Sequence, residues 1–130
     1  MKFATFNTDS SGGFSEFEVK DHDETEAVTY IKDVVGGFLE SVTLYKLGVT
    51  MWINEEGKLL GLPVNPIGTM FWTAEYGSTD TIVGNIVLTG IPDNEGWLTG
   101  LDEDFATMLA SCLHGPEDCP KNQEQSGELQ

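Results

Sequence analysis

Residues 49–65 of the chain read VTMWINEEGKLLGLPVN. In an extended chain, Val49, Met51 and Ile53 point to one side and the residues between them point to the other, which is the period of a strand. Residues 54–57, Asn-Glu-Glu-Gly, are typical of a turn because glycine adopts positive φ without steric cost. Residues 58–62 are expected to return as the partner strand, so that the stretch forms the central hairpin of the fold.

A helix is predicted directly after this stretch. The Asn65 side chain is suited to accept a hydrogen bond from a free amide of the first turn, and Pro66 at the first helical position loses nothing by lacking an N–H. We therefore interpret Asn65 as a helix cap in preference to a ligand contact. Glycine at position 77 ends the segment, and its expected apolar face consists of Ile67, Met70, Phe71 and Ala74.

The other elements follow from the same periodicities. Residues 81–89 form the most apolar run and predict a central strand, whereas residues 90–100 are expected to be a loop. Further strands are predicted over residues 2–6, 14–19 and 38–45. Helices are expected to start with Asp23 as a cap and near Asp102. The first of them is expected to end at Gly36 and Gly37, as a left-handed C-terminal cap does. The last helix is expected to bury Leu101, Phe105, Met108, Leu109 and Cys112.

These elements predict the α+β class: a small, mostly antiparallel sheet with about three helices packed on it. The chain of 130 residues is long enough for one core and too short for two. We assign residues 1–115 to a single acidic domain. Residues 116–130 are polar and are expected to be a disordered tail.

The charge of the chain excludes several classes of function. It contains 22 Asp and Glu, six Lys and no Arg, which gives a formal net charge of −16. This charge repels nucleic acid and anionic membranes, and the lack of Arg removes the usual bidentate contact to phosphate and guanine. Direct binding of DNA, RNA or a membrane is not expected.

The start of the chain has no signal-peptide pattern, and no run of about 18 apolar residues occurs. We therefore expect a cytoplasmic protein. Two cysteines do not make the disulfide framework of a small secreted domain.

Four blocks between Ile31 and Gly90 carry a resemblance. They read VGGFLE (35–40), MWINEEGK (51–58), GLPVN (61–65) and IVGNIVLTG (82–90). In order and spacing they resemble a family of small domains of unknown function found mostly in proteins of bacteriophages and plasmids. The resemblance covers nearly half of the chain and implies a viral or mobile-element protein that acts inside a bacterium. It implies no enzymatic activity.

A catalytic site has little support in the sequence. Glu55 and Glu56 invite an acid–base interpretation, but adjacent carboxylates in a turn usually point apart into solvent. The chain lacks the P-loop, H-E-x-x-H and dinucleotide-binding motifs. We expect no enzyme and no cofactor, and a weak enzyme that uses Glu55 or Glu56 stays as a third hypothesis.

A metal site is a weak candidate. Cys112, His114 and Cys119 have a spacing that no common zinc framework uses, with His22 or Asp118 as the fourth ligand. The main alternative is that both cysteines are free thiols, with Cys112 in the core and Cys119 in the tail. A disulfide between the two cysteines is another alternative. The acids of residues 21–24 and 102–104 lack the EF-hand pattern, and we interpret them as acids that complement helix starts.

The distribution of the acids is the positive signal. Residues 59–120 contain nine acids and no Lys or Arg, and residues 16–26 add six acids against Lys20. Solubility explains such a surface. So does a function in which carboxylates imitate nucleic-acid phosphates and occupy the basic groove of another protein, with Trp side chains as anchors. The partner-binding candidates are Trp52, Glu55, Glu56, Asp93, Glu95, Trp97, Asp102, Glu103 and Asp104.

The leading hypothesis is a phage-encoded, non-enzymatic inhibitor that binds a host protein with a basic surface. A restriction, CRISPR or transcription component is the expected kind of partner, and a homodimer stays open. The alternative is a protein that sequesters a nucleotide or another small molecule in a pocket between sheet and helix.

Overall fold

Five strands form one sheet, and three helices cover it. The computed structural model describes residues 1–8 and 14–113, with the side chains of 14–17 and 112–113 left out of the description. The strands are β1 (Lys2–Thr8), β2 (Phe14–Asp21), β3 (Leu39–Leu44), β4 (Val49–Asn54) and β5 (Ile86–Gly90). The helices are α1 (Ala27–Val35), α2 (Pro66–Tyr76) and α3 (Glu103–Leu113).

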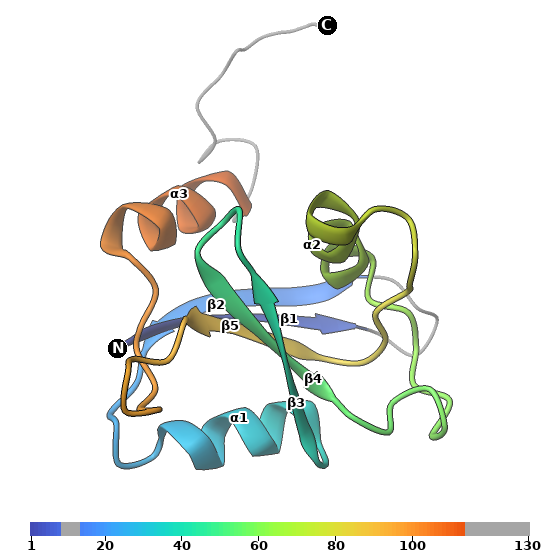
Figure 1. Cartoon of the computed structure of the whole chain (residues 1–130), viewed down its shortest axis with the longest axis horizontal. Coiled ribbons are helices and arrows are strands. Elements are labelled where there is room, and N and C mark those ends of the chain that lie inside the picture. Colours follow the sequence, from blue (N-terminus) through green and yellow to red (C-terminus); the bar gives the residue numbers. More distant parts are fainter. Residues whose placement is uncertain (9–13, 114–130) are drawn as a thin grey trace, which may run out of the picture.

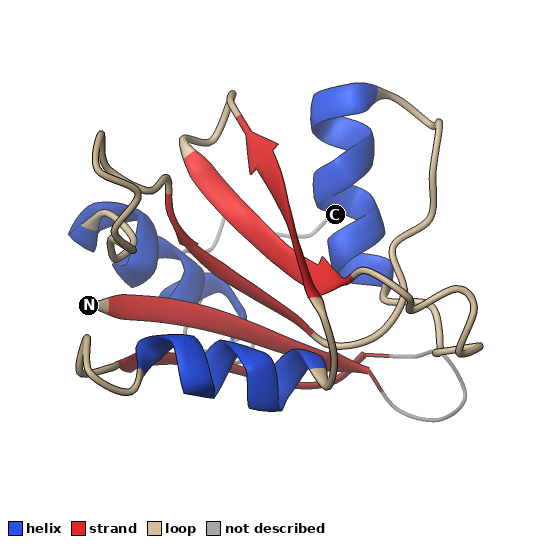
Figure 2. Cartoon of the chain, turned by 60° about the horizontal axis from the view of Figure 1, so that its bottom comes forward, coloured by secondary structure: helices blue, strands red, loops and turns tan. Residues whose placement is uncertain are grey.

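The sheet is antiparallel throughout, in the order β2-β1-β5-β4-β3. Helix α1 lies on one face, and α2 and α3 lie on the other (Figures 1 and 2). The α+β class is therefore confirmed, with three layers of structure. None of the helices in the described ranges is long and apolar enough to cross a bilayer.

Both faces of the sheet are buried, because side chains alternate along the central strands. On β1, Phe3 packs with α1 in one cluster, whereas Ala4 and Phe6 belong to the cluster below α2 and α3. On β5, Val87 joins the first cluster, and Ile86 and Leu88 join the second. All five residues of β5 are buried. The predicted central strand is thus confirmed, although it begins at Ile86 rather than at position 81.

The predicted return strand at residues 58–62 is wrong. These residues form successive turns, in which the Leu60 and Leu62 N–H groups donate to the carbonyls of Glu56 and Gly57 at 3.0 Å each. The hairpin partner of β4 is β3, and the opposite edge of β4 pairs with β5. No edge of β4 is left for another strand, so the chain turns away after Asn54.

Asn65 holds the start of α2, as the sequence predicts. Its Oδ1 accepts a hydrogen bond from the Gly68 N–H at 2.9 Å, and its Nδ2 donates to the carbonyls of Phe6 and Gly84. The side chain is fully buried. It therefore ties α2, β1 and the segment before β5 together, which explains why an amide and not a hydroxyl occupies this position.

The predicted faces of two helices need adjustment. On α2, Ile67 and Phe71 pack on the core as predicted, Met70 and Ala74 are exposed, and Trp72 packs on the core in addition. On α3, Met108 is 49% exposed while Ala106 and Leu109 are buried. The buried face of each helix therefore differs from the expected one by one or two residues.

Asp23 does not cap α1, contrary to the expectation. The residues after Asp23 form a turn, in which its Oδ1 accepts from the Thr25 N–H at 3.4 Å, and the helix starts at Ala27 after Glu26. The C-terminal end agrees with the prediction, since Gly36 has a φ of 82° and its N–H donates to the Lys32 carbonyl. Positive φ is favourable only for glycine here.

Candidate functional site: an acidic end of the sheet

Antiparallel pairing brings three distant segments to one end of the sheet. Because β1 runs opposite to both neighbours, its start lies beside the ends of β2 and β5. Lys2 is paired with Asp21, the His22 N–H donates to the Met1 carbonyl at 2.7 Å, and the Leu101 N–H donates to the Lys2 carbonyl at 2.8 Å. The turn before α1, the loop after β5 and the start of α3 therefore lie at the same end of the sheet, with the turn on the α1 side and the start of α3 on the other side (Figure 1).

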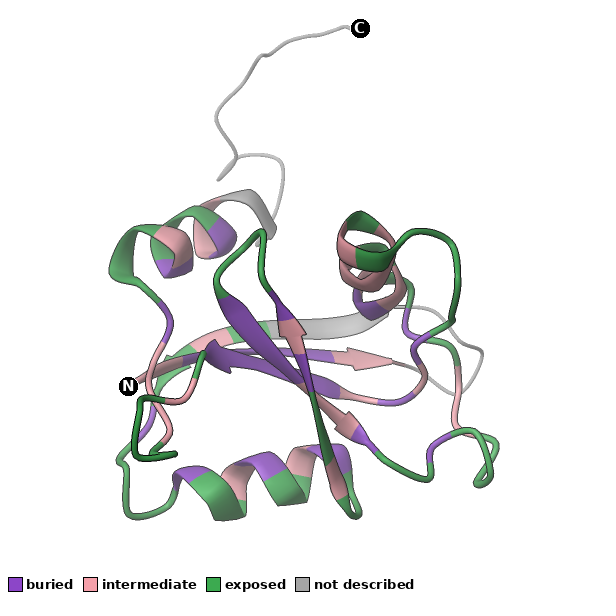
Figure 3. Cartoon of the chain, in the orientation of Figure 1, coloured by how far each residue is buried: buried purple, intermediate pink, exposed green. Residues whose placement is uncertain are grey.

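Nine exposed carboxylates gather at this place, which we call the acidic end. Figure 3 shows its three segments as largely exposed chain. Its members are Asp21, Asp23, Glu24, Glu26, Asp93, Glu95, Asp102, Glu103 and Asp104. Five of them are among the partner-binding candidates of the sequence, and four are additional.

One of these acids is neutralised within the chain. The Lys2 Nζ lies 3.0 Å from the Asp21 Oδ2. Hydrogen bonding and charge attraction to Lys2 lower the pKa of Asp21, and the same contact raises the pKa of Lys2. Asp21 therefore fastens β1 to β2 and contributes less negative potential than the others.

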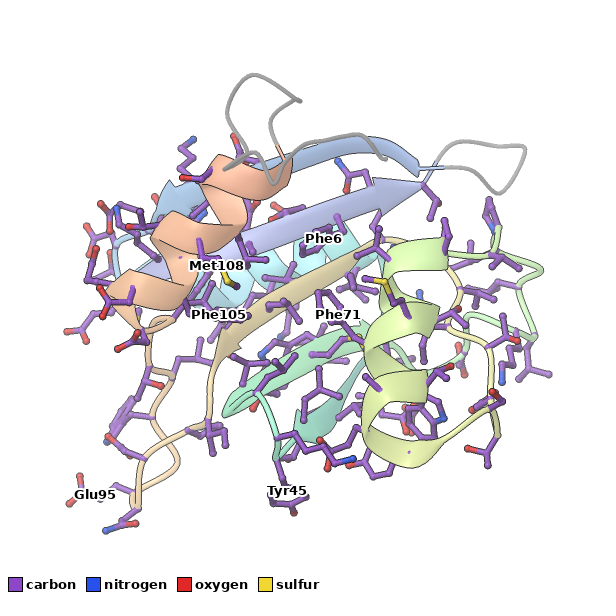
Figure 4. All side chains as sticks on the ribbon, turned by 90° about the horizontal axis from the view of Figure 1, so that it is seen from above. Phe6, Tyr45, Phe71, Glu95, Phe105 and Met108 are labelled. Atoms are coloured by element: carbon purple, nitrogen blue, oxygen red, sulfur yellow. The ribbon has the colours of Figure 1, made fainter. Side chains whose placement is uncertain are left out.

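Asp93 shapes the loop that follows β5. Its Oδ1 accepts hydrogen bonds from the N–H groups of Glu95 at 2.9 Å and Trp97 at 3.0 Å, and its own N–H donates to the Trp97 carbonyl. The Gly96 N–H donates to the Asp93 carbonyl, with a φ of 85° at Gly96. The loop tip is thus a closed turn built on one carboxylate, and Glu95 projects outward from it (Figure 4).

The base of this loop is packed against the sheet. The Gly90 N–H donates to the Thr99 carbonyl at 3.0 Å, and the Thr99 hydroxyl donates to the Ile91 carbonyl. A Cβ on Gly90 would collide with Thr99 and Gly100, and one on Gly100 would lie 2.8 Å from the Lys2 nitrogen. Glycine at both positions lets the loop lie close to the start of β1.

A groove lies between the loop tip and the turn before α1. It has a volume of about 740 Å³ and is lined by Met1, Glu24, Thr25, Val28, Asp93, Gly96, Trp97 and Leu98. The Trp97 side chain is 69% exposed and Val28 is 48% exposed. An apolar surface with two carboxylates thus lies within the acidic end.

The acids at the start of α3 have different tasks. The Asp102 Oδ2 accepts hydrogen bonds from the N–H groups of Asp104 and Phe105 at 3.1 and 3.2 Å. It caps the start of α3, a helix that the sequence predicts to begin near this residue. Within the described residues, the carboxylates of Glu103 and Asp104 form no such bonds and are available at the surface.

Three sequence candidates lie away from the acidic end. Glu55 and Glu56 follow the far end of β4, since Val49 at its start is the residue that pairs with Gly90. Trp52 is half-buried against the α1 side of the core, and its indole N–H donates to the Thr89 hydroxyl at 2.9 Å. It is therefore a core residue more than an exposed anchor.

A small cavity is found near Glu55. It measures about 160 Å³ and lies between the β3–β4 hairpin and α2, with Glu40, Lys58, Trp72 and Asp80 in its lining. The Lys58 ammonium pairs with the Asp80 carboxylate and lowers the pKa of that group. The sequence places neither Lys58 nor Asp80 in a site, because they are 22 residues apart.

Among the residues proposed as metal ligands, His22 is the one whose side chain lies in the described part of the chain. His22 is buried, and its ring stacks on Phe3 with centroids 5.2 Å apart and lies against Tyr30. Within residues 1–8 and 14–113, no group of three or more His, Cys, Asp and Glu side chains is arranged to hold a metal ion. His114, Asp118 and Cys119 lie outside the described residues, as do the Cys112 side chain, the predicted disulfide and the predicted tail.

Comparison with known proteins gives a family and no function. No curated protein and no solved structure matches the chain. One family model matches residues 11–114, which includes every strand and helix after β1. The acidic end is formed within this range, apart from the Met1 and Lys2 contacts. The chain belongs to the family described as a domain of unknown function, DUF3846.

Proposed function

We propose that the protein is a phage-encoded, non-enzymatic inhibitor that binds a basic surface of a host protein through its acidic end. The observation that carries this proposal is the concentration of exposed carboxylates from three segments of the sequence at one end of the sheet, where the Trp97 side chain is exposed as well. Six of the nine partner-binding candidates lie there. A surface of this kind suits rapid, electrostatically steered association.

The choice of partner class follows from the sign and exposure of the charge. A basic groove that normally holds DNA or RNA is complementary to a row of carboxylates, because both phosphates and carboxylates are anionic acceptors. A restriction, CRISPR or transcription component of a bacterial host has such a groove. The resemblance of the four sequence blocks to phage and plasmid domains supports this setting, in the cytoplasm of the host.

The absence of an enzymatic role is part of the proposal. The acids of the site have roles in structure or lie in solvent. Asp93 and Asp102 accept backbone hydrogen bonds, and Asp21 pairs with Lys2. Glu24, Glu95, Glu103 and Asp104 are exposed. This arrangement favours surface recognition over proton transfer, which needs carboxylates held at one reacting bond.

Affinity capture from a host lysate tests the proposal. We expect the tagged protein to retain a specific basic partner at about 50 mM salt and to release it at about 500 mM, since screening shortens the range of the attraction. Adding the protein to the purified partner should then inhibit its binding of nucleic acid. Retention of no basic partner, or of one that salt does not release, contradicts the proposal.

A small-molecule binder is the second candidate, supported by the cavity between β3–β4 and α2. Its 160 Å³ volume lies below the range of roughly 300–1,000 Å³ that is common for ligand sites. This favours a metabolite smaller than a nucleotide. A thermal-shift screen tests it: a rise in melting temperature with one small ligand, abolished by Lys58→Met, together with an empty capture experiment, supports this alternative over the first.

A further inference from the structure

The groove beside Trp97 has the shape and chemistry to select one kind of occupant. Its volume of about 740 Å³ falls within the common range for binding sites, roughly 300–1,000 Å³. Its walls come from two regions far apart in sequence: the turn before α1 together with Val28 in the first turn of α1, and the loop tip with Trp97. It is therefore a feature of the fold and not of one flexible segment.

The apolar part of the groove is unusual for this chain. Trp52 and Trp72 are half-buried, and each donates its indole N–H to a threonine hydroxyl at 2.9 Å. Trp97 is 69% exposed, and its indole N–H has no hydrogen-bond partner in the described part of the chain. A large exposed aromatic ring with a free donor is the kind of residue that dominates protein interfaces.

The Trp97 side chain is exposed although the loop that carries it is held by backbone hydrogen bonds. The Trp97 backbone is held on both sides, because its N–H donates to the Asp93 carboxylate and its carbonyl accepts from the Asp93 N–H. Thr99 and Gly90 then fix the loop base. The ring is presented on an ordered turn, so little conformational entropy is lost when a partner binds it.

The charged part of the groove decides the sign of the occupant. Glu24 and Asp93 contribute carboxylates, and no Lys or Arg is among the described lining residues. The ammonium group of Met1, which also lines the groove, is paired with the Asp21 carboxylate at 3.6 Å and donates to the His22 carbonyl. An anionic ligand is repelled there. A second copy of the chain would bring the same carboxylates, so a self-complementary contact is disfavoured as well.

We infer that this groove binds an extended, arginine- or lysine-bearing segment of the partner protein, with the alkyl part of the side chain on Trp97 and Val28 and the cationic head near Glu24 and Asp93. Arg and Lys combine an apolar stem with a charged tip, and a guanidinium stacks favourably on an indole ring. The inference rests on the proposed function and adds to it the position and type of the central contact.

Titration with a labelled peptide tests the inference on the full chain. The probe is a fluorescein-labelled nonapeptide that alternates Arg and Gly, and its control has citrulline, which is uncharged and of similar shape, in place of each Arg. We expect the Arg peptide to bind and the citrulline peptide to bind at least tenfold more weakly. Trp97→Ala should weaken Arg-peptide binding at least tenfold, as removal of a central aromatic anchor does, and Trp97→Phe should restore part of it.

Phe38→Ala is the matched control, because Phe38 is also 69% exposed and lies outside the groove. Its affinity for the peptide should equal that of the unchanged protein. The three indole N–H signals in a nitrogen–proton NMR spectrum give a second readout. On addition of the Arg peptide, the Trp97 signal should shift, whereas those of Trp52 and Trp72, held by threonine hydroxyls, should stay in place.

The outcomes separate this inference from the proposed function. If Trp97→Ala binds the peptide as tightly as the unchanged protein while loss of the surrounding acids weakens it, the groove inference is wrong and acidic-end binding stands. If the peptide shifts the Trp97 signal but no basic host partner is captured, the inhibitor function is wrong and the groove stands. Equal binding of the Arg and citrulline peptides overturns the charge selection on which the groove inference depends.

Discussion

The Asp93 carboxylate accepts a hydrogen bond from the backbone N–H of Trp97 at 3.0 Å, and this bond holds the exposed indole at the tip of the loop after β5. One residue thus contributes both to the shape of the acidic end and to its charge. The two contributions are separable by substitution, because an asparagine keeps the acceptor oxygen and removes the charge.

Asp93→Asn and Asp93→Ala should therefore behave differently. We expect Asp93→Asn to keep the slow amide exchange of residues 95 and 97 and to lower only the affinity for basic peptides. Asp93→Ala should speed that exchange at least tenfold, because two backbone N–H groups lose their acceptor. Hydrogen-exchange mass spectrometry measures the amide exchange of both variants. Equal exchange in the two variants would show that the carboxylate does not order the loop.

Gly90→Ala should displace the same loop from its base. The added Cβ would collide with Thr99 and Gly100, so the loop must move or the end of β5 must unpair. We expect a loss of stability of about 1–3 kcal/mol, as for overpacking elsewhere, and weaker peptide binding. Gly48→Ala is not a suitable control, since the φ of 69° at Gly48 adds backbone strain of its own. Ser78→Ala, at an exposed position outside the loop, should leave both properties unchanged.

Asn65 is predicted to be the most sensitive polar side chain of the core. Asn65→Ala leaves the Gly68 N–H and the carbonyls of Phe6 and Gly84 without this partner. We expect a loss of about 3 kcal/mol in the free energy of unfolding, measured by urea denaturation. Asn94→Ala, on the exposed loop, should change it by less than about 0.5 kcal/mol. A similar small loss in both variants would mean that the Asn65 network contributes little.

The Lys58–Asp80 ion pair should make the stability of the folded chain depend on pH. The hydrogen bond from Lys58, with help from the Thr81 N–H, holds the pKa of Asp80 below its ordinary value. A lowered pKa in the folded state gives stability that is present above the unfolded-state pKa and lost as the pH falls through the folded-state pKa. Lys58→Met should raise the Asp80 pKa toward its ordinary value in a carboxyl NMR titration, and Lys32→Met should not. An unchanged Asp80 pKa in Lys58→Met would contradict this assignment.

Salt should stabilise the folded chain. Nine carboxylates at one end repel each other in the folded state, and screening at about 0.5 M salt reduces the repulsion over distances beyond a few ångströms. We expect the melting temperature to rise by several degrees between low and high salt. Removing four charges of the acidic end should reduce this rise, and a salt-independent melting temperature would indicate that the acids lie too far apart to interact.

Local signals predicted most of the elements. Asn65-Pro66 predicted the start of α2, Gly36 predicted the end of α1, and the apolar run before Gly90 predicted the central strand. Each of these features depends mainly on residues that are neighbours in the chain. The prediction of a return strand at residues 58–62 was wrong because it depends on contacts that are distant in the sequence. Whether a strand forms there depends on a free edge of β4, and β5, more than 30 residues later, occupies that edge.

The acidic end was predicted only in part. Residues 93–104 contain six of the partner-binding candidates named from the sequence. The acids of residues 16–26 contribute to the predicted charge pattern, but none of them is a named candidate. The β1 register brings them together, and a single sequence does not specify which strands pair. Likewise, period-two alternation placed Trp52 opposite Met51 without revealing that α1 covers its side of the sheet.

The most direct test of the central claim is capture of the host partner by two variants that remove the same number of charges. One carries Glu24→Gln, Glu95→Gln, Glu103→Gln and Asp104→Asn at the acidic end. The control carries Asp33→Asn, Glu40→Gln, Glu55→Gln and Glu56→Gln. In the described part of the chain these eight carboxylates form no hydrogen bonds or ion pairs, so both variants should fold.

We predict that the acidic-end variant retains less than about a tenth of the partner retained by the unchanged protein, and that the control retains most of it, because loss of central interface contacts costs more than loss of remote charge. Quantitative mass spectrometry of the captured material measures both amounts. Equal retention by the two variants would contradict the claim that the acidic end is the binding surface.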